Sequence, residues 1–395
     1  MTKQALEPTH FPFFDYKGYS FSLGLETPAG IWLSGHTASR HSDELNRMIV
    51  QGEGDIVAQA RVSYDKIATI LQAAGLGLSN VVRLVDYVTA EGMTQYARLA
   101  ELRQELFGEH RPVINTVVVN RLLRRTAFIE IEAVAARDGS QAIGATIPDT
   151  YGVSGRQMGD VVYLSTQLPL QPNTQQVAAP GNIVGQTRQI YENVGQLLQQ
   201  ADLGWEHVVK TVEFLTPEGR AQYPDTGRIR REFLAPLFPA ATGIIMPRLA
   251  HPEALLQVDF VACRQPKTVI NPGWARYEQL TYAPATKSGH LICLAGQGAL
   301  NPETNEIEHP GDIVGQTRYV YTNLMKVLDA AGVGPQAVVK TIEFVTPAGL
   351  RAYRDTANVR REFFQSPLPA ATGIVCEALL RPEMLIEVDA WAIMP

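Results

Sequence analysis

The sequence has few cysteines, no long apolar run and no excess of basic residues. Three cysteines in 395 residues are too few and too scattered for a disulfide framework or a zinc site. No stretch approaches the roughly 18 apolar residues of a membrane span, and no basic start followed by an apolar run suggests a signal peptide. The formal net charge of −6 gives no electrostatic reason to expect nucleic acid. We therefore expect a soluble, cytoplasmic protein with neither membrane nor nucleic-acid partners.

Motifs that hold cofactors, metals or reactive serines are also missing. There is no GxGxxG after a strand, no phosphate loop, no HExxH and no GxSxG. The eight histidines show no metal-ligand spacing, and only His36 and His41 are near neighbours. The sequence therefore predicts no cofactor and no metal.

The sequence does contain three copies of one repeated unit. The text from Gly311 reads GDIVGQTRYVYTNLMKVLDAAGV, VVKTIEFVTPAGLRAYRDTANVRREFF and LPAATGIV. The text from Gly181 reads GNIVGQTRQIYENVGQLLQQADL, VVKTVEFLTPEGRAQYPDTGRIRREFL and FPAATGII. A fainter copy starts at Gly54 with GDIVAQARVSYDKIATILQAAGL. Three copies of a unit of about 130 residues account for nearly the whole chain.

The first copy shows the order of elements. Apolar residues recur at helical spacing over 55–74, and Gly75 follows as a stop. VVRLVDYVT alternates as a strand, 95–107 predicts a second amphipathic helix, and the strands INTVVV and AFIEIEAVAA are joined by NRLLRRT. The segment ASRHSDELNRMIVQGEG is longer than its counterparts, polar and punctuated by glycine, so we expect a loop.

Each repeat therefore predicts an α+β layer, with helices covering one face of a sheet. Polar linkers near 137–140 and 264–269 set the repeats at 1–138, 139–265 and 266–395. The other sheet face is also apolar, so the three sheets should cover one another around a pseudo-threefold axis, as the subunits of a homotrimer do. Self-association beyond this intramolecular pseudo-trimer stays open.

The repeats resemble the Rid/YjgF family of imine and enamine deaminases. The resemblance is carried by QAR followed by a tyrosine, by VVR or VVK leading into a strand, by the proline turn, and by IEIEA near the repeat end. It implies a chorismate-mutase-like unit, a central β-barrel with outer helices, and small-molecule clefts between neighbouring units. Three fused copies are also similar in organisation to cyanuric acid hydrolases, whose glycine-rich serine motifs are not evident here.

One feature of the family is missing from every copy. The active deaminases place an arginine two residues after the turn proline, where it grips the substrate carboxylate as a fork. The matching residues are Ile114, Ala241 and Ala371, and their aliphatic side chains cannot make that contact. We expect a neutral or cyclic ligand, a carboxylate held elsewhere, or an inactive site.

The resemblance also implies catalytic residues. The acid that orients water in the family maps to Glu130 and Glu387, with Gln257 in the middle copy. A desolvated carboxyl can exchange a proton near neutral pH, whereas glutamine cannot, so the three clefts should differ. His36 is the third candidate, because only the first copy has an imidazole in the turn after its first strand. A solvated strand face for the glutamates and a structural role for His36 remain open.

Candidate substrate-binding residues come from three positions in each repeat: the tyrosine near the first strand, the turn after that strand, and the residue after the missing arginine. They are Tyr19, Tyr151 and Tyr282; Ser34, Gly35, Gln167 and Gln297; and Asn115, Thr242 and Thr372. Hydroxyls, amides and backbone N–H groups suit a neutral ligand. Aromatic plugs and turn caps explain the same residues.

Charged residues recur at two positions of the central strand of each repeat. They are Arg83, Lys210 and Lys340 at the first position, and Asp86, Glu213 and Glu343 at the second. Positions three apart on a strand point to opposite faces, so the two groups cannot pair within one strand. We expect cross-strand or inter-repeat ion pairs that fix the pseudo-trimer.

Two functions of different classes follow. The first is an enzyme of the Rid superfamily that hydrolyses a C–N bond of an imine, enamine or amide-like small molecule in clefts between repeats. The second is a non-catalytic protein that binds a metabolite or a protein partner. The first copy has diverged at His36, Ile114 and Asn115. Specialisation of one copy favours the enzyme.

Overall fold

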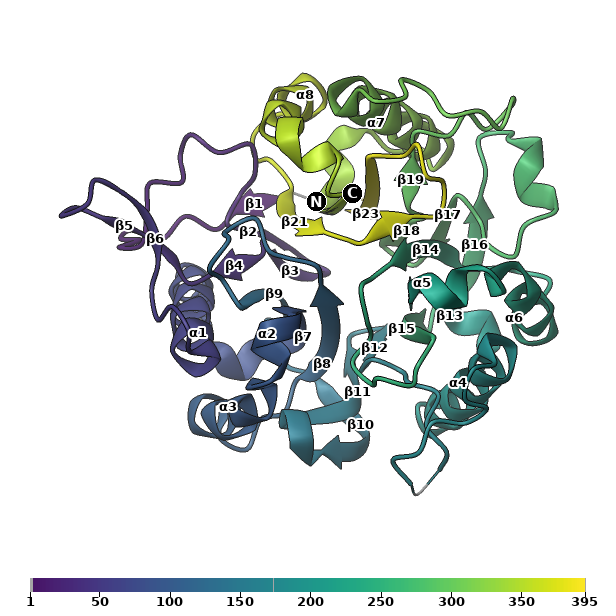
Figure 1. Cartoon of the computed structure of the whole chain (residues 1–395), viewed down its shortest axis with the longest axis horizontal. Helices are drawn as coiled ribbons and strands as arrows, with labels where there is room; N and C mark the ends of the chain where they lie inside the picture. The colour runs from purple at the N-terminus through teal and green to yellow at the C-terminus, as the bar shows by residue number, and fades with distance from the viewer. Residues whose placement is uncertain (1–2, 173, 395) are drawn as a thin grey trace.

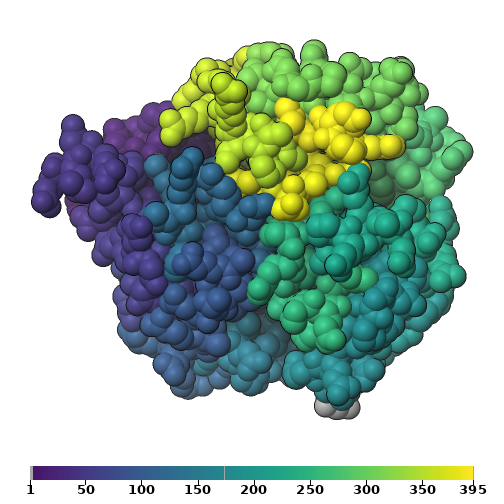
Figure 2. Space-filling model, viewed as in Figure 1, coloured from purple at the N-terminus to yellow at the C-terminus, as the bar shows by residue number. Residues whose placement is uncertain are grey.

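Figure 1 shows the computed structural model of the chain, which describes residues 3–172 and 174–394. Three lobes of similar build surround a common centre, with the long helices α1, α4 and α7 at the periphery and the sheets inside. Figure 2 shows the three lobes in contact with one another, and a protrusion formed by the N-terminal repeat at one edge. None of the helices described is long and apolar enough to cross a membrane.

Each repeat follows the predicted order of elements, with two further strands ahead of the predicted first strand (β3, β12 or β18). The first contains β1 (Gln4–Ala5), β2 (Gly24–Thr27), β3 (Gly30–Leu33), β4 (His36–Thr37), β5 (Ser39–Ser42), β6 (Arg47–Val50), α1 (Ile56–Gln72), β7 (Val81–Thr89), α2 (Ala90–Met93), α3 (Leu99–Phe107), β8 (Val113–Val119) and β9 (Ile129–Ala135). The second contains β10 (Gln141–Ile147), β11 (Gly152–Met158), β12 (Val161–Leu164), α4 (Ile183–Gln200), β13 (Val208–Leu215), α5 (Pro217–Arg220), α6 (Gly227–Leu234), β14 (Ala240–Ile245) and β15 (Leu256–Cys263). The third contains β16 (Lys267–Ile270), β17 (Ala285–Ser288), β18 (Leu291–Leu294), β19 (Gln297–Gly298), α7 (Ile313–Ala330), β20 (Val338–Val345), α8 (Thr356–Phe363), β21 (Ala370–Val375), β22 (Ala378–Leu379) and β23 (Ile386–Ile393).

The first helix of the N-terminal repeat illustrates how sequence sets these elements. The Asp55 carboxylate caps α1 by accepting from the Val57 N–H at 3.0 Å. Gly75 lies just beyond the helix at φ +71°, a conformation that glycine adopts without steric cost. The buried residues of α1, among them Tyr64 and Ile67, form the face of the helix that packs against the sheet.

The three sheets have the same internal order. In each, one parallel pair (β7–β8, β13–β14, β20–β21) lies beside an otherwise antiparallel ladder. The sheet faces away from the helices form shared clusters; one joins Val82, Val209 and Val339 from the three repeats. This confirms that the sheets cover one another. The ladders form three open sheets, so the central barrel implied by the family is not confirmed.

The predicted loop over 38–54 is wrong. Residues Ser39–Ser42 and Arg47–Val50 pair as the antiparallel hairpin β5–β6, which projects from the first repeat (Figure 1). Asn46 closes its turn at φ +45°, a conformation that asparagine adopts more readily than most residues. The short runs SRHS and RMIV were too polar and too brief to stand out from the glycines that flank them.

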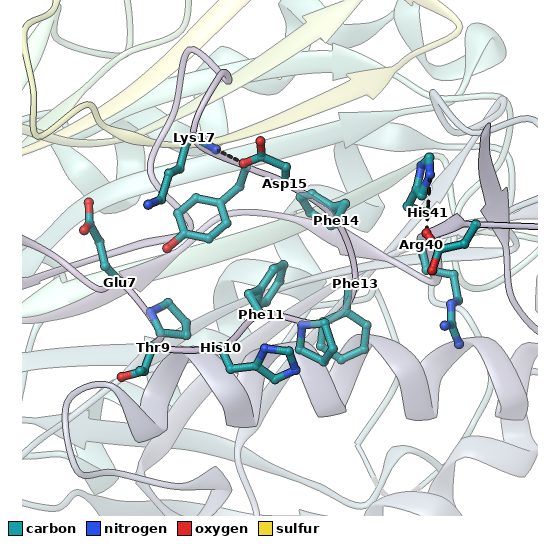
Figure 3. A pocket seen from close by; sticks show the side chains of 14 residues that line it. Glu7, Thr9, His10, Phe11, Phe13, Phe14, Asp15, Lys17, Arg40 and His41 are labelled. Atoms are coloured by element: carbon teal, nitrogen blue, oxygen red, sulfur yellow. Dashed lines mark hydrogen bonds and ion pairs between the residues drawn. The ribbon is translucent and has the colours of Figure 1, made fainter. Parts of the chain in front are cut away.

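The N-terminal aromatic segment packs beside this hairpin. Phe11, Phe13 and Phe14 gather above a helix in Figure 3, in a hollow that also includes Arg40 and His41. The ammonium of Lys66, on α1, lies 4.9 Å from the Phe14 ring and 5.3 Å from the Phe13 ring. The hollow is lined by residues of the first repeat.

Inter-repeat ion pairs hold the three lobes together, as predicted for the first charged position. Arg83 pairs with Asp259 at 3.4 Å, Lys210 with Asp389 at 2.5 Å, and Lys340 with Glu132 at 2.9 Å; each pair joins two different repeats. The residues of the second position instead pair with arginines of their own repeat, seventeen residues along the chain. These pairs are Asp86–Arg103, Glu213–Arg230 and Glu343–Arg360.

Candidate active site

Three seams between repeats have the same construction. An edge strand of one repeat lies against a turn of the neighbouring repeat. Strand β8 lies against the turn after β12, β14 against the turn after β18, and β21 against the turn after β3. The Gly35 N–H donates to the Ala371 carbonyl at 3.2 Å, and the Gly296 N–H donates to the Ala241 carbonyl at 3.1 Å. Their counterpart, the Thr166 N–H, donates to the Ile114 carbonyl at 3.4 Å. The seams differ in what fills the space beside these bonds.

The seam between the third and first repeats contains the largest cavity, of about 1080 Å³, which we name cleft 3–1. Its walls come from β4, β9 and α1 of the first repeat and from β21 and α8 of the third, and include His36, Lys66, Glu130 and Arg360. The structure therefore brings together two of the three predicted catalytic residues, Glu130 and His36, in one cavity.

Glu130 lies on β9 with only 7% of its surface exposed. Burial, followed by the charge of Glu132, raises its pKa to about 8, because both oppose formation of the carboxylate. Glu130 therefore carries a proton at neutral pH. A carboxyl in that form can donate to a ligand nitrogen and later accept a proton back.

His36 and Lys66, two other titratable groups of this wall, differ from Glu130 in that burial lowers their pKa values. His36 is 3% exposed; burial and the charges of Lys66 and Lys340 lower its pKa, which makes the imidazole neutral. Its Nε2 has no hydrogen-bond partner within residues 3–172 and 174–394. The Lys66 ammonium donates to the Thr37 carbonyl at 2.7 Å, and burial lowers its pKa to about 7. The Nε2 of His36 is thus buried and unsatisfied in the wall of the cleft.

In the opposite wall, from the third repeat, the Glu343 carboxylate is held by several donors. The Glu343 carboxylate accepts from Arg360 Nη1 at 2.5 Å and from the Tyr353 and Tyr321 hydroxyls at 2.6 Å each. Arg360 Nε also donates to the Ser20 hydroxyl of the first repeat at 3.0 Å. This network fixes the two walls relative to each other and leaves Glu343 no free oxygen for proton transfer.

The seam between the second and third repeats holds a smaller cavity of about 420 Å³, cleft 2–3. Glu387 is 6% exposed there, and burial followed by the Asp389 charge raises its pKa to about 8. Gln297 replaces the imidazole, and Tyr282 lines the cavity. Cleft 2–3 therefore repeats the acid of cleft 3–1 in a narrower space without the histidine.

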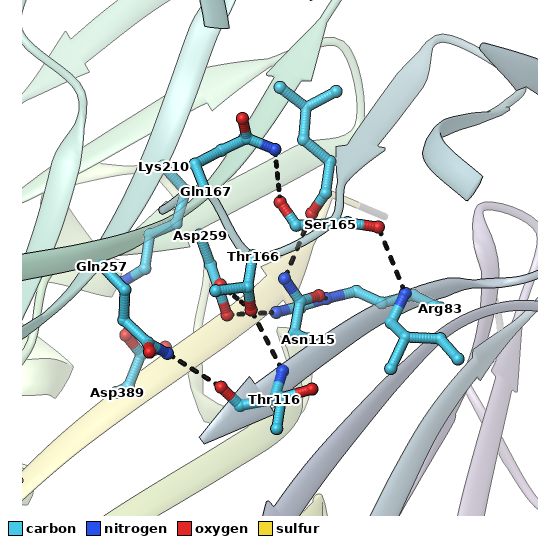
Figure 4. Close-up of polar contacts among 12 residues, drawn as sticks. Arg83, Asn115, Thr116, Ser165, Thr166, Gln167, Lys210, Gln257, Asp259 and Asp389 are labelled. Atoms are coloured by element: carbon cyan, nitrogen blue, oxygen red, sulfur yellow. Dashed lines mark hydrogen bonds and ion pairs between the residues drawn. The ribbon is translucent and has the colours of Figure 1, made fainter. Parts of the chain in front are cut away.

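The seam between the first and second repeats is filled (Figure 4). Thr116 and Thr166 stand where the other seams have glycine, and the Thr166 hydroxyl accepts from the Thr116 N–H at 3.0 Å. The Gln257 amide donates to the Thr116 carbonyl at 2.8 Å. Arg103 and Asp86 of the first repeat form a fully buried pair. Gln257 stands at the position of Glu130 and Glu387, and its amide cannot exchange a proton as those carboxyls can.

Several predicted binding residues have their polar groups occupied by hydrogen bonds within or between repeats. The Ser34 hydroxyl donates to the Ser22 carbonyl at 2.7 Å and accepts from the Ala371 N–H at 2.8 Å. Thr372 donates to Glu132 at 2.6 Å. The remaining members of this set are Thr242, which bonds Lys210; Asn115, which bonds Arg83; Gln167, which bonds the Ser165 carbonyl; and Tyr151, which bonds the Gly108 carbonyl.

The predicted binding residues that do line cavities are Tyr19, Gly35 and Thr372 in cleft 3–1, and Tyr282 and Gln297 in cleft 2–3. Sequence reasoning missed Lys66, whose counterparts in the other repeats are Asn193 and Asn323. A lysine in the buried face of a predicted helix was the available signal, because an unpaired lysine is rarely buried.

Replacing Gly35 by alanine should disable cleft 3–1 selectively. The added methyl would lie 2.3 Å from the Glu130 carboxyl and 2.8 Å from Thr372 Cγ2, so Glu130 must move. We expect a loss of unfolding free energy of about 1–3 kcal/mol, typical of overpacking, and loss of whatever activity depends on Glu130. Gly195→Ala is the control, because its methyl meets only Trp205 at 3.7 Å. Full activity in Gly35→Ala would remove Glu130 from the site.

Comparison with known proteins agrees with this architecture. The family model for Endoribonuclease L-PSP matches three times, at residues 18–137, 147–264 and 276–394. A RutC family protein of Pyrococcus horikoshii is 32% identical over 111 residues, which are 28% of this chain and 85% of that protein. A 2-iminobutanoate/2-iminopropanoate deaminase of Dermatophagoides farinae is 31% identical over 109 residues, 28% of this chain and 83% of that protein.

Two solved structures have related folds. A member of the YjgF/YER057c/UK114 family from Mycobacterium tuberculosis is 25% identical, covers 32% of this chain and 99% of its own, and has a TM-score of 0.28. A chorismatase is 15% identical, covers 80% of this chain and 93% of its own, and has a TM-score of 0.49.

The molecule is thus a tandem α+β protein. Its three repeats pack around a common centre, with clefts at seams between them. The chain belongs to the Endoribonuclease L-PSP family, the Rid/YjgF family that its repeats resemble, and contains three copies of the family's domain.

Proposed function

We propose that cleft 3–1 hydrolyses a C–N bond of a small imine or enamine, with Glu130 as the proton-transfer group and His36 as a positioning group. The observation that carries this proposal is a buried, protonated carboxyl in the wall of a large cavity. Buried carboxyls with raised pKa values are typical of general acids. The relative named as an iminobutanoate and iminopropanoate deaminase supports the reaction class.

In the proposed reaction Glu130 both donates and accepts protons. Glu130 donates its proton to the imine nitrogen, which makes the carbon more electrophilic. Water attacks this carbon, and the Glu130 carboxylate takes the proton that the water loses. The same proton then passes to the amine nitrogen, the hydroxyl of the water adduct returns its proton to the Glu130 carboxylate as the C–N bond breaks, and the products are a carbonyl compound and ammonia. Tyr19 and His36 line the same cavity; Tyr19 would contact the ligand, and His36, whose Nε2 is buried, would position the wall around it.

The rate should depend on pH through Glu130. The carboxyl is protonated below a pKa of about 8, so the form that activates the imine is present at neutral pH and is lost as pH rises through 8. We expect kcat/KM to fall about tenfold for each pH unit above that pKa. Measuring kcat/KM from pH 6 to 10 tests this, and a rate that rises across pH 8 would contradict the assignment of Glu130 as the acid.

Ammonia release from freshly generated substrates tests the function directly. The panel should contain imines of several amino acids, neutral enamines and cyclic amides, each compared with a buffer blank. Release above the blank supports the hydrolase, and the substrate group that reacts identifies its class. Silence across the panel would overturn the proposal in favour of a protein that binds a metabolite without converting it.

A further inference from the structure

Arginines dominate the rim of cleft 3–1. Eight arginines and Lys66 line it, against three glutamates. The arginines come from three segments: the hairpin, the turn between β8 and β9, and the region from residue 351 to the end of α8. They are Arg47; Arg121, Arg124 and Arg125; and Arg351, Arg354, Arg360 and Arg361.

Most of this charge has no partner. Arg360 is neutralised by Glu343, but Arg124, Arg125, Arg351 and Arg354 form no ion pair with any carboxylate in the part of the chain that the structure describes. The protein as a whole is acidic, with a net charge of −6. Positive charge concentrated in the walls of a cavity raises the local concentration of anions and guides them inward.

Part of this charge is particular to cleft 3–1, whereas Arg124 has a counterpart in Arg381, which lines cleft 2–3. At the positions of Arg351, Arg354 and Arg125, the repeats that form cleft 2–3 have alanine or proline; these residues are Ala221, Pro224 and Pro382. The additional arginines therefore accompany His36 and Lys66, which also occur only in cleft 3–1. Copies of one ancestral cleft have diverged in charge as well as in catalytic side chains.

We propose that the ligand of cleft 3–1 carries at least two anionic groups, carboxylates or phosphates, held by Arg124 and Arg125 of the first repeat and by Arg351 and Arg354 of the third. The inference rests on the function proposed above, because the same cavity holds Glu130. Arginine binds both groups as a planar fork. Two pairs of arginines on different repeats suit two separated charges better than one.

A ligand with two anionic groups differs from the neutral ligand that the missing turn arginine suggested. Ala371 leaves no cation at the place where the family grips a single carboxylate. The charge is instead supplied by surface segments of two repeats around a cavity of about 1080 Å³. A ligand bound in this way is larger than a small imino acid and is anchored away from the atoms that react.

Calorimetric titration with simple probes tests the proposal. Citrate and pyrophosphate represent the multiply charged carboxylate and phosphate, and acetate is the singly charged reference. We expect citrate or pyrophosphate to bind with a dissociation constant at least about tenfold below that of acetate, and the double variant Arg351→Gln, Arg354→Gln to weaken this binding about tenfold or more. Preference for citrate or for pyrophosphate distinguishes the two sources of charge.

Arg228→Gln is the matched control, because Arg228 is exposed on the second repeat and has no ion-pair partner among the described residues. Equal weakening in this control, absence of multi-anion binding, or binding of an RNA oligonucleotide in preference to both small probes would each overturn the inference. The binding assay needs no turnover. Ammonia release without anion binding would refute this inference alone, whereas anion binding without ammonia release from any substrate would refute the hydrolase alone.

Discussion

Replacing Glu130 by glutamine is expected to lower kcat by about 10²–10⁴-fold, the range for loss of a general acid–base group. Glutamine has nearly the same shape and can still donate a hydrogen bond, but it cannot pass a proton to the leaving amine. Gln257 already occupies the equivalent position of the filled seam, so the fold accommodates this side chain. Steady-state kinetics with a substrate found by the ammonia assay gives the measurement.

Two companion variants make this result specific. Glu232→Gln is the control, because Glu232 is exposed and its ion pair with Arg188 lies on the surface; its rate and its stability should stay close to those of the wild type. Glu387→Gln tests the acid of cleft 2–3. A large loss of rate in Glu387→Gln, with an unchanged rate in Glu130→Gln, would move the reaction from cleft 3–1 to cleft 2–3.

The repeat architecture was predictable because its signals are local or periodic. The alternation in VVRLVDYVT predicted a strand, and β7 covers this run residue for residue at Val81–Thr89. The inter-repeat role of Lys210 followed from strand geometry, because Glu213 lies three positions along and points to the other face. Both predictions rest on residues within one strand, so they do not depend on which loops come together in the folded chain.

The character of each cleft was not predictable in the same way. Arg124 and Arg351 line one cavity although more than two hundred residues separate them, and only the closure of the third repeat on the first brings them together. The NRLLRRT segment was visible as a connection, but nothing in the sequence assigns it to a cavity. A signal for the filled seam did exist: Thr166 stands where the other copies have Gly35 and Gly296.

The inter-repeat ion pairs should matter more for stability than any surface pair. Lys210 and Asp389 are fully buried; the Lys210 ammonium lies 2.5 Å from the Asp389 carboxylate and donates to the Thr242 hydroxyl at 3.0 Å. Lys210→Met removes one charge and leaves the other without compensation in the interior. We expect the free energy of unfolding to fall by about 3–5 kcal/mol, measured by chemical denaturation.

The double variant Lys210→Met, Asp389→Leu separates the cost of an uncompensated charge from the contribution of the pair. Because a well-packed apolar pair often replaces a buried ion pair with little loss, this variant should recover most of the stability of the wild type. Arg318→Gln breaks an exposed pair with Glu362 and should change the stability little, because water screens such pairs. If Lys210→Met is no more destabilised than Arg318→Gln, the buried pairs do not hold the repeats together. If the double variant is as unstable as Lys210→Met, the loss comes from packing and hydrogen bonds at the seam, since no unpaired charge remains there.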